Sequence, residues 1–185
     1  MKYQVVVVDP PWKFSDNLTM SKTKRGGASN YDCINTKSLI SDIHVHNWIE
    51  SDAILALWFP AAMMKDAIYV AESWGFKPKQ IYTWVKSTKH GKIHFGMGHY
   101  FRNSTEYSLI GIKGSPRILS KSYRNIGFAQ SISHSAKPEC LQDSLEKMFE
   151  GPYIELFARR QRNNWTCVGL ECTDGIKIDL RKWKP

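Results

Sequence analysis

The stretch that decides the fold is 3–12, which reads YQVVVVDPPW. Its four consecutive valines are typical of a strand that is buried on both faces, as in a parallel sheet covered by helices. The valines lead directly into the tetrapeptide Asp9-Pro10-Pro11-Trp12. Because ligands bind beyond the carboxyl ends of the strands in an open parallel sheet, this tetrapeptide is the first candidate for a functional site.

The tetrapeptide has the groups needed to hold a flat nucleobase that carries an amino group. The lone pair of such an amine is delocalised into the ring, and hydrogen-bond acceptors draw it out. Asp9 offers two carboxylate oxygens, and Pro10 and Pro11 leave main-chain carbonyls in a rigid segment without competing N–H donors. Trp12 offers an aromatic face for an unstacked base, worth about 1–3 kcal/mol. The alternative interpretation is a strand that ends at a Pro-Pro turn, with the tryptophan in the core.

The composition predicts an ordinary globular protein. A chain of 185 residues with 42% hydrophobic residues and seven Trp is enough for one domain over 1–185 with a substantial core. The four cysteines form no C-x-x-C pair, which argues against a zinc site and favours a reducing cytoplasm. The N-terminal apolar run is too short for a signal peptide or a membrane span. Histidines 90, 94 and 99 match no standard ligand spacing, so no metal is expected.

Positive charge is segregated along the chain. The formal net charge is +9, and the segment 77–124 alone carries +9, with ten Lys and Arg against the single acid Glu106. Aromatic residues are interleaved with these charges, among them Trp84, Phe95 and Phe101. This pattern favours binding to nucleic acid, since each phosphate contact releases counterions. The alternative is a solvated basic face that keeps the protein soluble.

The periodicity of the sequence predicts an α/β fold with a mostly parallel sheet. Strands are expected at 3–8, 53–59, 81–85, 106–112 and 153–157, with two final strands at 164–169 and 176–180 that could pair as a hairpin. Helices are expected at 36–50, capped by Thr36, at 61–74, and at 137–149, capped by Ser135. The stretches 13–30 and 87–103 are expected to be loops. Three segments should reach one cleft, namely 9–12, 134–139 and 155–162.

An ordered series of motifs along nearly the whole chain resembles one family. The chain is similar to the MT-A70 family of S-adenosylmethionine-dependent adenine N(6)-methyltransferases, whose catalytic signature matches Asp9-Pro10-Pro11-Trp12. The other matching segments are Tyr31, Leu55-Ala56-Leu57-Trp58, Trp84-Val85-Lys86, Gly98-His99-Tyr100, Glu106, Gly111-Ile112-Lys113-Gly114, His134-Ser135-Ala136-Lys137-Pro138-Glu139, Glu155-Leu156-Phe157-Ala158-Arg159 and Asn164-Trp165. Each motif is weak alone, but the ordered set is highly specific.

The resemblance implies a Rossmann-like methyltransferase fold with helices on both faces and a circularly permuted motif order. It also implies the cofactor S-adenosylmethionine, with Lys137 on the cofactor carboxylate. The implied cofactor-binding residues are Asp9, Lys137, Glu155, Phe157, Arg159, Gln161 and Glu171, and the implied substrate-binding residues are Tyr31, Lys86, His99 and Glu106. One departure is the sequence Gly169-Leu170-Glu171, where relatives commonly have Gly-Asn-Glu, so one polar cofactor contact is lost.

The resemblance and the basic segment together predict methyl transfer to the 6-amino group of adenine, with DNA preferred over RNA. A non-catalytic nucleic-acid-binding subunit and a methyltransferase for small molecules or proteins are the alternatives. The expected setting is the cytoplasm of a bacterium or a phage-infected cell, without membrane association, and a homodimer is plausible. The run 159–162 could contact cofactor or phosphate, or be only a solvated turn. Glu106 could pair internally or read a base, whereas Trp74 and Trp84 are expected in the core.

Overall fold

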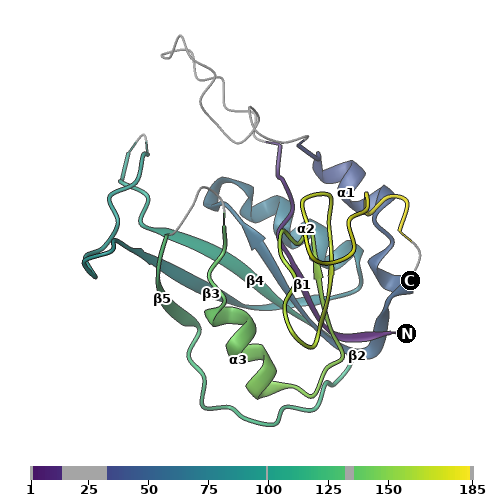
Figure 1. The fold of residues 1–185 in the computed structure, drawn as a ribbon. Helices are drawn as coiled ribbons and strands as arrows, with labels where there is room; N and C mark the ends of the chain where they lie inside the picture. The colour runs from purple at the N-terminus through teal and green to yellow at the C-terminus, as the bar shows by residue number, and fades with distance from the viewer. Residues whose placement is uncertain (1, 14–32, 99, 132–135, 184–185) are drawn as a thin grey trace.

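The computed structural model describes residues 2–13, 33–98, 100–131 and 136–183, and these form one seven-stranded sheet (Figure 1). The strand order is β5-β3-β4-β2-β1-β6-β7. The strands are β1 (Tyr3–Val8), β2 (Ile49–Phe59), β3 (Lys77–Ser87), β4 (Thr105–Lys113), β5 (Ile126–Gln130), β6 (Tyr153–Leu156) and β7 (Trp165–Val168). Only β4 runs antiparallel to its two neighbours, β2 and β3, and every other pairing is parallel. The predicted mostly parallel sheet is therefore confirmed.

Strand β1 lies near the centre of the sheet and contributes to both layers of the core. Val6 and Val8 pack with helices α1 (Thr36–Asp42) and α2 (Met64–Ser73), whereas Val5 and Val7 pack with α3 (Cys140–Met148). The alternation follows from the two-residue period of a strand, which points successive side chains to opposite faces. Helices thus cover both faces, as a Rossmann-like methyltransferase fold requires (Figure 1).

The first helix differs from the prediction in both its cap and its length. Asn35, and not Thr36, is the N-cap, and its side chain accepts from the Ser38 N–H at 2.9 Å. The Thr36 hydroxyl instead donates to Asp66 of α2 at 2.6 Å. The helix ends at Asp42 and not near residue 50, because the chain turns through a 3-10 segment at Val45–Asn47 and then enters β2.

The second helical stretch and the third helix agree more closely with the sequence. A 3-10 turn at Ala61–Met63 leads into α2, and Gly75 ends that stretch with a φ of +85°, a conformation that glycine adopts at little cost. Helix α3 begins at Cys140, three residues later than expected, so Lys137 lies in the lead-in to the helix. The predicted capping residue Ser135 lies outside the described residues.

Two expectations about strands were wrong. The edge strand β5 was missed, because IGFAQ is short and half-exposed and lacks a clear alternation. The segment 176–180 forms no strand, and Ile176 makes only an isolated parallel bridge to Val168, so there is no final hairpin. Most of the predicted loop at 13–30 lies outside the described residues. Within the described part of the chain, no helix has the length and apolarity needed to cross a membrane.

Candidate active site

The carboxyl ends of β1, β2 and β6 meet at one edge of the sheet. The parallel registers pair Val8 with both Leu57 and Leu156, so the residues that follow these strands are neighbours. Asp9 follows β1, and its N–H donates to the Leu156 carbonyl at 3.3 Å. The expected convergence of polar groups at the end of parallel strands is therefore present.

Two cavities meet at this edge, and Asp9 belongs to both. The first has a volume of about 490 Å³ and the second about 400 Å³, both in the range of small-molecule sites. They share Asp9, Pro11, Cys33 and Arg159 as lining residues. We call them the first and the second cavity, and the carboxylate of Asp9 lies where they join.

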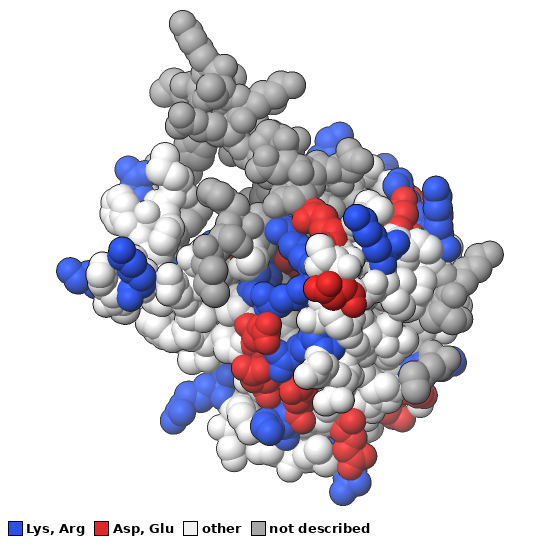
Figure 2. Space-filling view, in the orientation of Figure 1, with Lys and Arg blue, Asp and Glu red and all other residues white. Residues whose placement is uncertain are grey.

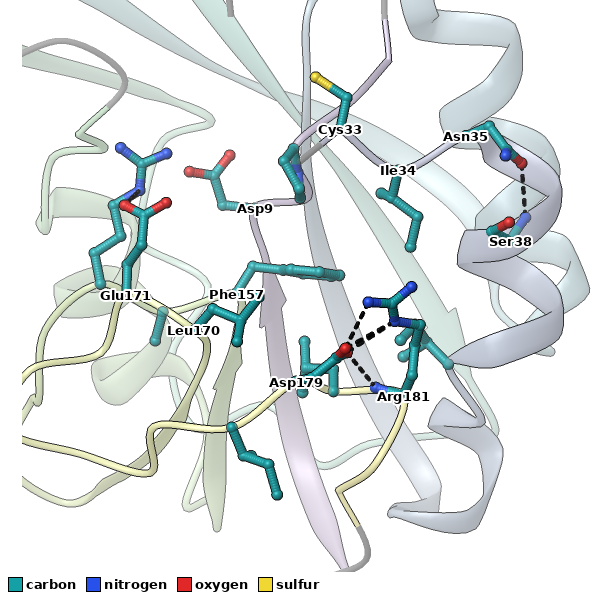
Figure 3. Close-up of a pocket in the computed structure, with 16 residues that line it drawn as sticks. Asp9, Cys33, Ile34, Asn35, Ser38, Phe157, Leu170, Glu171, Asp179 and Arg181 are labelled. Carbon is teal, nitrogen blue, oxygen red and sulfur yellow. Dashed lines mark hydrogen bonds and ion pairs between the residues drawn. The ribbon is translucent and has the colours of Figure 1, made fainter. Parts of the chain in front are cut away.

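The first cavity is formed by the end of β6, the segment before α1 and the C-terminal loop (Figure 3). The ring of Phe157 extends across it, toward Asp179 and Arg181 (Figure 3). Phe157 has a φ of +59°, a left-handed conformation that non-glycine residues rarely adopt and that is typically retained at functional sites. Glu171 adds a carboxylate on the side of Arg159, 3.7 Å from its Nε. The cavity thus combines an aromatic ring with several carboxylates.

The second cavity has apolar and aromatic walls with charged groups at one side. Its walls are Pro10, Pro11, Trp12, Trp58, Phe59, Pro60, Ala61 and Tyr107, and its charged groups are Asp9, Lys86, Glu106, Lys137 and Arg159. Flat apolar walls with a few convergent polar groups suit a planar aromatic ligand that carries hydrogen-bonding groups.

A chain of alternating charges links the charged groups of the second cavity. The Lys137 Nζ lies 2.8 Å and 3.0 Å from the two carboxylate oxygens of Asp9, and 3.3 Å from Glu106 Oε2. Glu106 also pairs with Lys86. The side chains of Asp9 and Lys137 are only 14% and 13% exposed. Glu106 is therefore an internal ion-pair partner, and its contact with a base stays a prediction.

These contacts set the ionisation of the central pair. Burial alone would lower the pKa of Lys137, but the Asp9 and Glu106 carboxylates outweigh it and hold that pKa above its ordinary value. Burial alone would raise the pKa of Glu106, yet Lys137 and Lys86 keep that pKa below its ordinary value. Lys137 and Glu106 are therefore both charged at neutral pH.

The tetrapeptide is held in place by its own backbone and by the segment before α1. Ile34 donates its N–H to the Pro11 carbonyl at 2.8 Å, and the Trp12 N–H donates to the Pro10 carbonyl at 2.9 Å. A carbonyl oxygen has two lone pairs, so Pro10 keeps one for a ligand. Trp12 is only 5% exposed, and its indole N–H donates to the Trp58 carbonyl at 2.8 Å. The indole is thus fixed in the wall of the second cavity, with little of its face open.

Two of the expected cofactor-binding residues line neither cavity. Glu155 faces α3, where it accepts from Gln142 at 3.4 Å. Burial raises the pKa of Glu155 to about 7, partly opposed by the Gln142 hydrogen bond and reinforced by the charge of Asp9. Gln161 donates to the carbonyls of Arg162 and Trp165 at 2.9 Å and 2.8 Å and so braces the turn before β7. Their role in cofactor binding stays a prediction.

The arginine run divides into two roles. Arg159 lines both cavities, whereas Arg162 bonds to Glu139, Asp143 and Glu146 around α3. Arg160 contacts Glu139 and the Lys137 carbonyl, so this turn is tied to the segment that carries Lys137. In Figure 2 acidic and basic groups are interleaved over the centre of the face.

Several lining residues were missed in the sequence. Asp179 and Arg181, which pair at 2.9 Å and 3.0 Å, line the first cavity, but the alternating pattern there had favoured a strand. Phe59 and Pro60 line the second cavity at the end of β2, and the rule that identified Asp9 also applies to them.

Tyr31 and His99 lie outside the described residues. Among the described residues, no group of His, Cys, Asp and Glu side chains could hold a metal ion.

Comparison with known proteins decides the family. Residues 3–171 match the family model described as MT-A70. The chain belongs to the MT-A70 family. The resemblance inferred from the ordered motifs is confirmed, and with it the prediction that the chain is a methyltransferase. Trp74 and Trp84, expected in the core, are 2% and 1% exposed.

The MT-A70 relatives include a prokaryotic methyltransferase and several eukaryotic ones. The type II methyltransferase M.MunI of Mycoplasma sp. is 31% identical over 97% of this chain and 81% of its own length. The human N(6)-adenosine-methyltransferase catalytic subunit METTL3 is 26% identical over 96% of this chain and 29% of its own length. A Medicago truncatula protein described as a putative N(6)-adenosine-methyltransferase MT-A70-like is 27% identical over 96% of this chain and 27% of its own length. The chain therefore spans less than a third of these two eukaryotic relatives.

Proposed function

We propose that this MT-A70 protein transfers the methyl group of S-adenosylmethionine to the 6-amino group of adenine in DNA. The observation that carries the proposal is the position of Asp9, whose carboxylate lies where two ligand-sized cavities join. A group-transfer enzyme needs such a junction, because donor and acceptor must meet beside the same side chain.

The residues of the first cavity fit the cofactor. Phe157 offers an apolar ring for a purine, and Glu171 and Asp179 offer carboxylates for ribose hydroxyls. Asp9, at the junction, suits the ammonium group of the amino-acid end, and Lys137, which lines the second cavity and contacts Asp9, suits its carboxylate. When bound, S-adenosylmethionine supplies an electrophilic methyl group.

The second cavity would hold the target adenine after it turns out of its strand. Asp9 and the Pro10 carbonyl would accept hydrogen bonds from the amino group and favour the tetrahedral nitrogen of the transition state. Lys137 holds both oxygens of Asp9, and Glu106 in turn holds Lys137, so the acceptor is oriented before the base arrives. Acceleration would come from positioning and from acceptors already aimed at the developing positive charge.

DNA is favoured over RNA on the basis of the comparisons. The chain is 31% identical to the type II methyltransferase M.MunI over 81% of that protein's length, whereas it is 26% identical to human METTL3 over 29% of that protein's length. The basic segment 77–124 supports a nucleic acid substrate in preference to a small molecule.

The deciding experiment incubates the protein with isotope-labelled S-adenosylmethionine and DNA, RNA or protein pools, and identifies the labelled nucleosides by mass spectrometry. We expect label in N(6)-methyl-2′-deoxyadenosine. Label only in the ribonucleoside would replace DNA by RNA, and label in neither nucleoside would refute the proposal.

The matched variant is Asp9→Asn, which keeps the size of the side chain but loses its charge. We expect methyl transfer to fall by at least about 10²-fold, the scale of removing one group that stabilises the transition state, while cofactor binding by calorimetry is partly retained. Glu72→Gln, an exposed acid on α2, serves as the control and should change neither quantity. Full activity of Asp9→Asn would end the proposal.

A further inference from the structure

The described residues of the connection between β3 and β4, 88–98 and 100–104, project from the edge of the sheet (Figure 1). Its two limbs are joined by hydrogen bonds near the base. The His94 N–H donates to the Lys86 carbonyl at 2.8 Å, and the Ser104 hydroxyl donates to the His94 carbonyl at 2.7 Å. The Thr88 N–H closes a tight turn on the Lys92 carbonyl at 2.8 Å. The described residues of the projection are therefore held by hydrogen bonds to each other and to β3.

Glycine allows the limbs to approach closely farther out. A Cβ on Gly96 would lie 2.1 Å from the Asn103 carbonyl oxygen, and one on Gly98 would lie 2.1 Å from the Phe101 carbonyl oxygen. The Asn103 side chain donates to the Met97 carbonyl at 2.9 Å. No other residue type fits at these two positions without moving the backbone.

The projection exposes large apolar side chains. Phe95, Met97, Tyr100 and Phe101 are 76%, 85%, 97% and 88% exposed. Four large apolar side chains exposed within the seven residues 95–101 favour an interaction site over singly scattered surface residues. Fully presented rings are the surfaces on which nucleobases stack.

The charges around these rings favour a polyanion over a protein surface of mixed charge. The sequence 87–105 contains Lys89, Lys92 and Arg102 and no Asp or Glu. The Arg102 guanidinium lies 5.2 Å from the centre of the Phe95 ring, so a cation and an aromatic face are presented together. In Figure 2 the side of the molecule that carries this projection shows basic groups without acidic ones, whereas the acids gather toward the centre.

The projection also lies beside the second cavity. Asn103 lines that cavity, and the main chain of Lys86, another lining residue, bonds to both limbs through Ser104 and His94. A nucleic acid strand whose adenine enters the cavity would therefore pass against the projection.

We propose that the projection formed by 88–98 and 100–104 is a nucleic-acid-binding element, which stacks its exposed aromatic rings on bases next to the target adenine and holds the adjoining phosphates with Lys89, Lys92 and Arg102. This inference rests on the proposed function and adds the surface that holds the flanking nucleotides. The ligand of this surface is a nucleic acid strand.

The test measures binding of a fluorescently labelled, adenine-containing DNA, as duplex and as single strand, by anisotropy without cofactor. The double variant Tyr100→Ala/Phe101→Ala should weaken binding at least about 30-fold, the lower end of the range for the loss of two stacked bases. Tyr69→Ala, which removes an exposed aromatic ring from α2, is the matched control and should leave affinity unchanged. The affinity for S-adenosylmethionine should be the same in all three proteins.

Two outcomes would overturn this inference. One is binding by the double variant within about twofold of the unchanged protein, since lost stacking must appear in affinity. The other is an unchanged protein that sediments as a dimer while the double variant sediments as a monomer, which would assign the rings to contact with a second copy. The binding assay does not depend on methyl transfer. If only the proposed function is wrong, no methylated adenine will be found, but the double variant will still bind DNA more weakly than the unchanged protein.

Discussion

At the scale of single residues, the decisive feature is that the one ammonium group of Lys137 contacts two carboxylates at once. Asp9 and Glu106 both contact its ammonium group, and all three side chains are largely shielded from water. Two carboxylates this close would repel each other without the cation between them. Lys137 therefore orients the acceptor Asp9, in addition to its proposed contact with the cofactor carboxylate.

Replacing Lys137 with an uncharged residue should destabilise the folded protein. Lys137→Met should lower the free energy of unfolding by about 3 kcal/mol, because it removes the cation that both shielded carboxylates share and leaves Glu106 with Lys86 alone. Denaturant unfolding measures this, and Lys86→Met, which removes only the outer cation, is the control with an expected smaller loss. Equal losses in the two variants would contradict the central role of Lys137.

Glu155 leads to a pH-dependent prediction. Its pKa is raised to about 7 in the folded protein, above its unfolded value, so the folded state holds the proton more tightly and stability falls as pH rises between the two values. Glu155→Gln removes this loss. The variant should gain on the order of 2 kcal/mol of unfolding free energy relative to the unchanged protein between about pH 4 and pH 8. If the difference in unfolding free energy between the two proteins does not change with pH, burial does not raise the pKa of Glu155.

At the scale of elements, one arginine ties α3 to the turn between β6 and β7. Arg162 contacts carboxylates at the start and on the side of α3, and its guanidinium has the planar fork that serves several partners at once. Lys137 lies just before this helix. The same contacts that anchor α3 therefore also hold the segment that presents the central cation.

Removal of the Arg162 guanidinium should destabilise the packing of α3. Arg162→Met should cost about 2 kcal/mol of stability in thermal or chemical unfolding, since it breaks hydrogen-bonded ion pairs to three carboxylates. Arg162→Lys should restore only part of this, because an ammonium group cannot reproduce the fork. Arg160→Met, at a more exposed position, is the control, and a loss as large as that of Arg162→Met would contradict the assignment.

At the scale of the whole molecule, the net positive charge is concentrated on one side. The segment 77–124 spans β3, β4 and their connection, and it carries the entire net charge of the chain. Elsewhere acids and bases balance, and many of them pair, as around α3. One side of the molecule is thus positive and next to the second cavity, which would guide a polyanion toward it.

This distribution predicts a strong dependence of DNA binding on salt. The logarithm of the binding constant should fall linearly with the logarithm of salt concentration, with a slope of about −0.9 per phosphate contact. Lys89→Gln/Lys92→Gln should reduce the slope by about 2 if each lysine contacts one phosphate. Lys2→Gln/Lys65→Gln, two lysines outside the segment, is the control, and an equal change in slope there would argue against a localised binding side.

Much of the layered architecture was predictable because it depends on local patterns. The four valines predicted β1 with its observed bounds, and the tetrapeptide after them identified the edge where the cavities lie. The end of the first helix was not predictable from local sequence. The apolar spacing continues past Asp42, but Ile49 and the residues after it form β2, which pairs with β1 and β4. The edge strand β5 likewise depends on β3 as a partner, since its own sequence has little strand character.

The sequence by itself determined the family, the central strand and the acidic acceptor at its end, because each is encoded by neighbouring residues. Only the tertiary structure decided that Lys137 joins Asp9 to Glu106, that Glu155 faces α3, and that Asp179 belongs to the first cavity. The physical reason is that these contacts join residues far apart in the chain. Their partners are selected by strand order and by burial, and neither of these is written in any local pattern.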